Sequence, residues 1–143
     1  MKIGEVYYWK TEKVIGHDDR NKYHLFMCLA DWEDDHIFLF INKSGNAWDL
    51  EIHNTHPSFT YLPLNTSFID CGSVVTYTTA EIAEIWKEHG RESLKGRINI
   101  NIAKSLLSKL HDSKVMRRSH KKKLCTVLRD VISKSEVNKA ATH

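Results

Sequence analysis

Residues 23–42 read YHLFMCLADWEDDHIFLFIN. The stretch consists of two continuous apolar runs, residues 23–30 and residues 36–42, separated by the acidic segment of residues 31–35. Apolar runs of this length are typical of strands that are buried on both faces of a sheet. The sequence therefore predicts two adjacent core strands joined by an acidic turn.

Further short strands are predicted on both sides of this pair. Residues 4–10 are aromatic and β-branched, residues 48–53 alternate between apolar and polar side chains, and residues 72–78 read GSVVTYT. Short strands at a spacing of about ten residues, with turns between them, indicate a small antiparallel barrel or sandwich.

The pattern then changes to a helical one. Residues 80–89 are expected to form a helix with Thr79 as its N-cap and Gly90 as its stop. Residues 95–111 begin with alternating isoleucines, which indicate an extended lead, and continue with apolar residues at helical spacing.

A second amphipathic helix is predicted over residues 119–133, with Ser119 as a possible cap, and residues 135–143 are expected to form a frayed tail. The predicted fold class is therefore α+β, with a small antiparallel β-barrel followed by C-terminal helices.

Charge divides the chain into two parts. Residues 1–103 hold 10 Lys and Arg against 15 Asp and Glu, whereas residues 104–143 hold 11 against 3. This asymmetry predicts a barrel domain over residues 1–103 and a basic helical extension over residues 104–143 with an anionic partner. The alternative interpretation is that the basic residues of this extension only form a solvent-exposed face of the helices.

Composition excludes several classes of protein. The chain of 143 residues is 41% hydrophobic and 27% charged, which is ordinary for a globular domain. Its apolar runs are shorter than the roughly 20 residues that a membrane span needs, and the N-terminus does not resemble a signal peptide. Three widely spaced cysteines favour free thiols in the cytoplasm over a disulfide framework.

Common catalytic and cofactor motifs are missing from the sequence. It contains no glycine-rich phosphate loop, no GxSxG, no HExxH and no paired CxxC motifs. Its nine histidines lack the spacing of metal ligands. We therefore expect neither a metal site nor a cofactor.

Four stretches, taken in order, resemble the PemK/MazF (Kid-like) toxins of type II toxin–antitoxin modules. They are GEVYYW at residues 4–9, GHDDRNKYHLFMCL at residues 16–29, FLFINKS at residues 38–44 and SFIDCGSVVTYTTAEI at residues 67–82. The resemblance extends over residues 1 to 111. It implies an SH3-like barrel, a homodimer, a cognate antitoxin protein as partner, and metal-independent endoribonuclease activity on single-stranded RNA.

Such an enzyme cleaves RNA through the 2′-hydroxyl and leaves a 2′,3′-cyclic phosphate. The reaction needs a base, an acid and a cation near phosphorus. His17 is a candidate for either proton-transfer role, and Asp70 is a candidate base or a partner that orients His17. Arg20 or Lys22 is expected to hold the phosphate.

Other polar and aromatic residues at the strand ends are candidates for RNA binding. Ser44 or Ser67 could donate to a phosphate oxygen, and Tyr23 or Trp48 could stack on an unpaired base. Each candidate also has a structural interpretation: a hydrophilic loop for residues 17–20, a turn-capping carboxylate for Asp70 and a turn residue for Ser44. The predicted catalytic residues are His17, Arg20 and Asp70, and the predicted RNA-binding residues are Lys22, Tyr23, Ser44, Trp48, Ser67, Arg117, Arg118, Lys121 and Lys122.

A second hypothesis is a non-catalytic SH3-like module that binds nucleic acid or a protein partner. The basic run of residues 117–123 lies between the two predicted C-terminal helices. It could brace the barrel, bind RNA phosphates or bind an acidic segment of an antitoxin.

Overall fold

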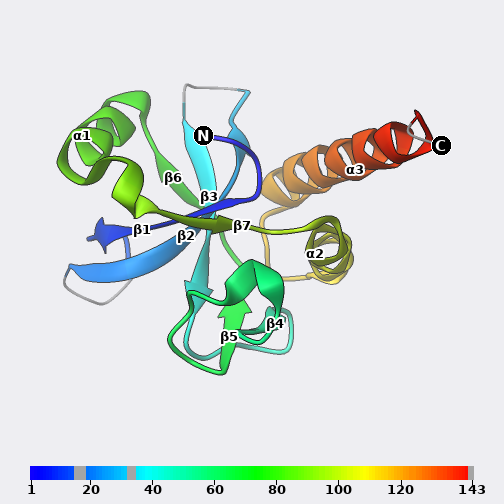
Figure 1. The fold of residues 1–143 in the computed structure, drawn as a ribbon, viewed down its shortest axis with the longest axis horizontal. Helices are drawn as coiled ribbons and strands as arrows, with labels where there is room; N and C mark the ends of the chain where they lie inside the picture. Colours follow the sequence, from blue (N-terminus) through cyan, green and yellow to red (C-terminus); the bar gives the residue numbers. More distant parts are fainter. Residues whose placement is uncertain (15–18, 32–34, 142–143) are drawn as a thin grey trace.

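The computed structural model describes residues 1–14, 19–31 and 35–141 as an α+β fold with a curled antiparallel sheet and three helices (Figure 1). This confirms the predicted class, the antiparallel sheet and the C-terminal helices. The strands are β1 (Glu5–Thr11), β2 (Arg20–Leu29), β3 (His36–Asn42), β4 (Leu50–His53), β5 (Thr66–Ile69), β6 (Val75–Tyr77) and β7 (Leu94–Arg97). The helices are α1 (Thr79–His89), α2 (Ile100–Asp112) and α3 (Arg118–Ala141), and two short 3₁₀ helices cover Pro57–Phe59 and Gly90–Ser93.

The long strands β1, β2 and β3 form an antiparallel meander at the centre of the sheet. The strand order is β4-β5-β3-β2-β1-β7, and β6 also pairs with β3. Two short strands therefore share one side of β3: β5 pairs near Ile41, and β6 pairs along the stretch from His36 to Phe38. This half-barrel contains the two core strands predicted from residues 23–42.

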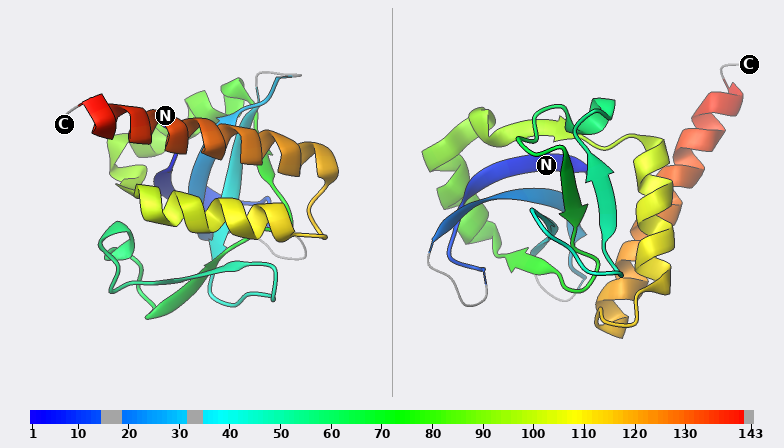
Figure 2. Two further views of the ribbon diagram at one scale, coloured as in Figure 1. Left: turned by 90° about the vertical axis from the view of Figure 1, so that its right-hand side faces the viewer. Right: turned by 90° about the horizontal axis from the view of Figure 1, so that it is seen from below.

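Side chains that alternate along the central strands build a core on each face of the sheet. On one face Leu25 and Leu39 pack in a cluster with Leu106 of α2 and Leu124 of α3. Figure 2 shows α2 and α3 side by side across this face.

On the other face, α1 covers a second, aromatic cluster. It consists of Tyr7, Trp9, Phe26, Phe38 and Tyr77, and Ile82 and Ile85 of α1 pack against it. The sheet is thus buried on both faces along its centre, which explains why residues 23–30 and 36–42 are apolar without alternation.

The C-terminal helices belong to the same core as the sheet. The predicted boundary after residue 103 falls inside α2, whose Ala103 and Leu110 pack with Leu25 and Leu39. The prediction that residues 135–143 form a frayed tail is wrong as far as residue 141, because α3 continues to Ala141. The ion pairs of Lys134 with Asp130 and of Lys104 with Glu136 stabilise these extra turns.

Several predicted element starts are corrected by the hydrogen bonds of the caps and turns. The helix α1 has Thr78 rather than Thr79 as its N-cap, in a capping box with Glu81. The helix α2 begins at Ile100 because the Asn99 side chain accepts a hydrogen bond from the backbone N–H of Ile102. The extended segment before it, β7, ends at residue 97.

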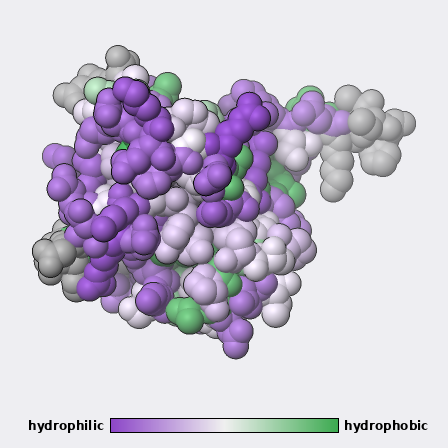
Figure 3. All heavy atoms as spheres, turned by 60° about the vertical axis from the view of Figure 1, so that its left-hand side comes forward, coloured by the Kyte–Doolittle hydropathy of each residue, from purple (hydrophilic) through white to green (hydrophobic). Residues whose placement is uncertain are grey.

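The surface around α1 is largely hydrophilic. Figure 3 shows hydrophobic side chains only as small separate patches on this face. Across residues 1–14, 19–31 and 35–141, no helix combines the length and the hydrophobicity that a membrane crossing requires.

Candidate functional site

Two of the three predicted catalytic residues lie at the ends of strands that flank β3. Arg20 is the first residue of β2, and Asp70 directly follows β5 and donates its backbone N–H to the carbonyl oxygen of Phe40 in β3 at 2.9 Å. The charges of Arg20 and Asp70 both act on Lys22: Arg20 lowers the pKa of the lysine, and Asp70 raises it. His17 lies outside the described residues.

Lys22 is the residue on which both charges act. Its ammonium group donates a hydrogen bond to Oδ1 of Asn42 and lies 5.2 Å from the ring centroid of Phe40. Partial burial lowers the pKa of Lys22 below its usual range, the nearby charges of Arg20 and Lys43 lower it further, and the carboxylate of Asp70 opposes them. A lysine whose pKa is perturbed by burial and by specific charges is a candidate functional group.

Asp70 is held in place by the turn that follows it. Its Oδ1 accepts the backbone N–H of Gly72 at 2.7 Å and that of Ser73 at 3.3 Å, and its Oδ2 accepts the hydroxyl of Ser73 at 3.1 Å. The turn-capping interpretation of Asp70 is therefore confirmed. We call Arg20, Lys22 and Lys43 the cationic cluster, because the charges of Arg20 and Lys43 both act on Lys22.

A cavity of about 210 Å³ adjoins the cationic cluster. Tyr23 and Ser67, both predicted to bind RNA, line this cavity together with Lys22 and Lys43. The rings of Tyr8 and Tyr23 pack with centroids 4.3 Å apart at one wall. A cavity lined by cations and by aromatic rings has the chemistry to bind a phosphate and a base.

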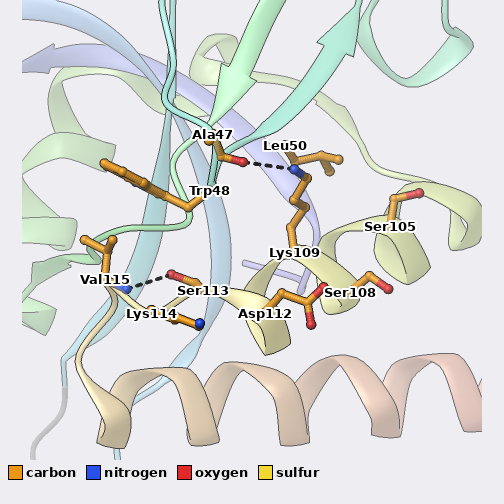
Figure 4. Close-up of a pocket in the computed structure, with 10 residues that line it drawn as sticks. All are labelled: Ala47, Trp48, Leu50, Ser105, Ser108, Lys109, Asp112, Ser113, Lys114 and Val115. Carbon is orange, nitrogen blue, oxygen red and sulfur yellow. Dashed lines mark hydrogen bonds between the residues drawn. The ribbon is translucent and has the colours of Figure 1, made fainter.

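Ser44 and Trp48 lie elsewhere. Ser44 is exposed in the turn after β3, as the structural interpretation expected. Trp48 lines a second cavity, of about 580 Å³, between the turn before β4 and the end of α2 (Figure 4). The predicted strand starting at Trp48 begins only at Leu50, because Asp49 forms a turn by accepting the backbone N–H of Asn46 at 2.8 Å.

The basic residues of the C-terminal helices have divided roles. Lys121 donates to the carbonyl oxygen of Ser113 at 2.9 Å and Lys123 pairs with Asp31 at 2.7 Å, so both brace the fold. Arg117, Arg118 and Lys122, the other predicted RNA-binding residues of this segment, are exposed.

A buried polar network beneath the aromatic cluster was not predicted from the sequence. The imidazole of His24 lies 2.8 Å from the carbonyl oxygen of Lys22 through Nδ1 and 2.9 Å from the hydroxyl of Tyr77 through Nε2. The Tyr77 hydroxyl also forms hydrogen bonds with the Thr11 hydroxyl at 2.6 Å and with the indole N–H of Trp9 at 3.3 Å.

Burial lowers the pKa of His24 to about 3. The ring is therefore neutral at pH 7, and its two nitrogens lie within hydrogen-bond distance of the Lys22 carbonyl oxygen and the Tyr77 hydroxyl. The only signal in the sequence was a histidine inside an apolar run.

Across the described ranges, no group of three or more His, Cys, Asp and Glu residues is arranged to hold a metal ion. The chain matches no protein-family model, no curated protein and no solved structure.

Proposed function

We propose that this protein is a metal-independent endoribonuclease that cleaves single-stranded RNA through the 2′-hydroxyl. The observation that supports the proposal is the half-buried Lys22, which feels the charges of Arg20, Lys43 and Asp70 and lines a cavity together with two packed tyrosines. Cations held at fixed positions stabilise the charge that develops on a phosphate during such a reaction.

In the proposed reaction the 2′-oxygen attacks phosphorus and the bond between phosphorus and the 5′-oxygen breaks. The products are a 2′,3′-cyclic phosphate and a 5′-hydroxyl. Arg20 binds a non-bridging oxygen, and Lys22 stabilises the pentavalent phosphorus or donates a proton to the leaving 5′-oxygen. His17 takes the proton of the 2′-hydroxyl, a role assigned from its place in the chain three residues before Arg20.

Asp70 has a positioning role in this scheme. Its two oxygens are engaged by the turn, and its charge raises the pKa of Lys22, so it helps to keep the ammonium group protonated. The prediction that Asp70 acts as the base or orients His17 remains a prediction.

The test is incubation of the purified protein with a defined single-stranded RNA in the presence of a chelator. We expect fragments with 2′,3′-cyclic phosphate and 5′-hydroxyl ends. Lys22→Met and Arg20→Ala should reduce cleavage by two orders of magnitude or more, about what a lost electrostatic contact to the transition state removes. Lys95→Met, on the exposed edge strand β7, is the matched control and should leave cleavage unchanged.

A toxin role within a type II toxin–antitoxin pair, with an SH3-like barrel and a homodimer, follows from the sequence resemblance. We expect growth arrest when the chain is expressed in bacteria, rescue by an acidic antitoxin encoded beside it, and loss of arrest with His17→Ala or Arg20→Ala. Full toxicity of those variants would contradict the assigned site.

The second candidate function is a non-catalytic module that binds nucleic acid. It is favoured by the hydrogen bonds that occupy both oxygens of Asp70. In that case the protein should bind RNA in a salt-dependent manner and yield no cyclic-phosphate ends.

A further inference from the structure

A second cavity lies beyond the turn that contains Asp70. It is the 580 Å³ cavity of Figure 4, which we call the Trp48 pocket, and its lining includes Trp48, Leu50, Lys109, Lys114 and Val115. Trp48 and the half-exposed Val115 supply apolar surface. The ammonium group of Lys109 crosses the cavity and donates to the carbonyl oxygen of Ala47 at 3.1 Å.

The turn of residues 70–73 packs against residues that line the Trp48 pocket. A Cβ atom added to Gly72 would lie 2.7 Å from the indole nitrogen of Trp48, and Gly72 itself donates to Asp70. The backbone carbonyl oxygen of Cys71, in the same turn, accepts a hydrogen bond from the hydroxyl of Ser113 at 2.8 Å. Ser113 also lines the pocket. This turn therefore packs against Trp48 and Ser113 of the pocket lining, and it also holds Asp70, whose charge acts on Lys22.

A series of exposed cations continues from the pocket. Lys114 lines it, and Arg117, Arg118 and Lys122 are exposed in the next eight residues of the chain. An aromatic ring flanked by cations on both sides matches the alternation of base and phosphate along a single strand. A purely acidic peptide would not use the indole face of Trp48.

We infer that the Trp48 pocket binds an unpaired base of the RNA strand that flanks the cleaved phosphate, and that Lys114, Arg117 and Arg118 bind the phosphates that follow. The inference rests on the proposed function and adds to it a second nucleotide subsite, whose basic residues Lys114, Arg117 and Arg118 lie outside the segment that resembles the toxin family. The protein should accordingly prefer an RNA long enough to reach from the cationic cluster to the basic turn.

The test measures binding of RNAs of about 4 and about 10 nucleotides, which span the range of site sizes seen for small single-strand binders. Methyl groups on every 2′-oxygen block cleavage, so binding is measured separately from catalysis. Trp48→Ala should weaken binding of the longer RNA roughly tenfold and leave the shorter one nearly unchanged. Trp48→Phe should restore much of the loss, and Trp86→Ala, at an exposed tryptophan of α1, is the matched control.

Charge provides an independent arm of the test. Replacing Lys114, Arg117 and Arg118 by Ala should reduce the slope of log affinity against log salt by about 2, since each phosphate contact contributes about 0.7. Removing Lys87, Arg91 and Lys95, which are exposed on and after α1, should change the slope much less.

A last variant guards against loss of folding in Trp48→Ala. Ser108→Glu places a carboxylate at the exposed edge of the pocket and should weaken binding of the longer RNA, whereas Ser133→Glu on α3 should not.

Equal binding of both RNA lengths by wild type and all pocket variants, with RNA cleavage intact, would overturn the inference alone. If the wild-type protein neither binds nor cleaves RNA, both the proposed function and the inference fail. Binding of an acidic peptide instead of RNA at the pocket would also overturn it.

Discussion

His24 and Tyr77 are 53 residues apart in the sequence, and Nε2 of the imidazole lies 2.9 Å from the phenolic oxygen. The pair connects β2 with β6, although these strands are not neighbours, because β3 lies between them. The ring of Trp9 stacks on His24 with centroids 4.2 Å apart and completes a closed polar centre within the aromatic cluster.

Acid should destabilise the protein through His24. Its folded-state pKa of about 3 lies below the ordinary value of 6.5, so the unfolded chain binds a proton first. The stabilisation from the neutral ring is complete above pH 6.5 and is lost as the pH falls from 6.5 towards 3. Near pH 4.5 the loss is about 3 kcal/mol.

Chemical denaturation between pH 7.5 and 4 measures this effect. His24→Gln should lower stability at pH 7.5 and flatten its pH dependence, whereas His53→Ala, at an exposed histidine, should leave the slope close to that of wild type. Equal slopes for wild type and His24→Gln would exclude His24 as the source.

Asp49 should contribute strongly to stability because it joins two turns. Its Oδ1 accepts the backbone N–H of Cys71 at 2.9 Å, its Oδ2 accepts that of Asn46 at 2.8 Å, and the residue is 5% exposed. Asp49→Ala leaves the buried N–H of Cys71 and the more exposed N–H of Asn46 without their charged acceptor, and it should cost about 2–4 kcal/mol of unfolding free energy. Urea denaturation with Glu51→Ala as the exposed control measures it, and a change below 1 kcal/mol would count against this role.

The thiols should react slowly in the folded protein. Burial raises the pKa of Cys28 to about 11 and that of Cys71 to about 12, and Cys125 is buried as well. Since the thiolate is the reactive form, a maleimide should label all three cysteines in denaturant and fewer than one per chain within minutes under native conditions. Rapid native labelling would show that the core opens locally.

The alkaline limb of the cleavage rate should report the ionisation of Lys22. If the protonated ammonium group is needed, the rate falls at a lower pH than an ordinary lysine would give, because burial and the charges of Arg20 and Lys43 lower its pKa. Lys22→Arg should abolish this fall, since arginine stays charged. Lys43→Met should move the limb to higher pH and Asp70→Asn to lower pH, and an unchanged limb in all three would remove Lys22 from the mechanism.

The central strands were predictable because their signal is local. Residues 23–30 and 36–42 are apolar throughout since both sheet faces are covered, and they became β2 and β3. The start of α2 was less predictable: Ile98, Ile100 and Ile102 alternate as in a strand, and only the cap formed by Asn99 separates the extended part from the helix. In α3, Glu136 contacts Lys104 of α2, a tertiary contact that no local pattern specifies.

At the candidate site, too, the sequence predicted individual residues but not their tertiary contacts. Arg20, Lys22 and Asp70 were each candidates from the sequence, and the charges of Arg20 and Asp70 both act on Lys22 in the structure. The tertiary contacts determine what each group can do: Asp70 is engaged by its own turn, and Lys121 caps α2. Such partners lie on other elements and have no signature in the spacing of residues.

Because α1 and the C-terminal helices lie on opposite faces of the sheet, the charge difference between the two parts of the sequence becomes a charge difference between two sides of the molecule. Residues 104–141, with eight more positive than negative charges, lie mainly on one side of the sheet, while the acidic helix α1 lies on the other. The molecule is therefore an electric dipole, even though its net charge is only +3. A polyanion approaching within a Debye length, about 10 Å in 0.1 M salt, would turn the protein so that α2 and α3 meet it first.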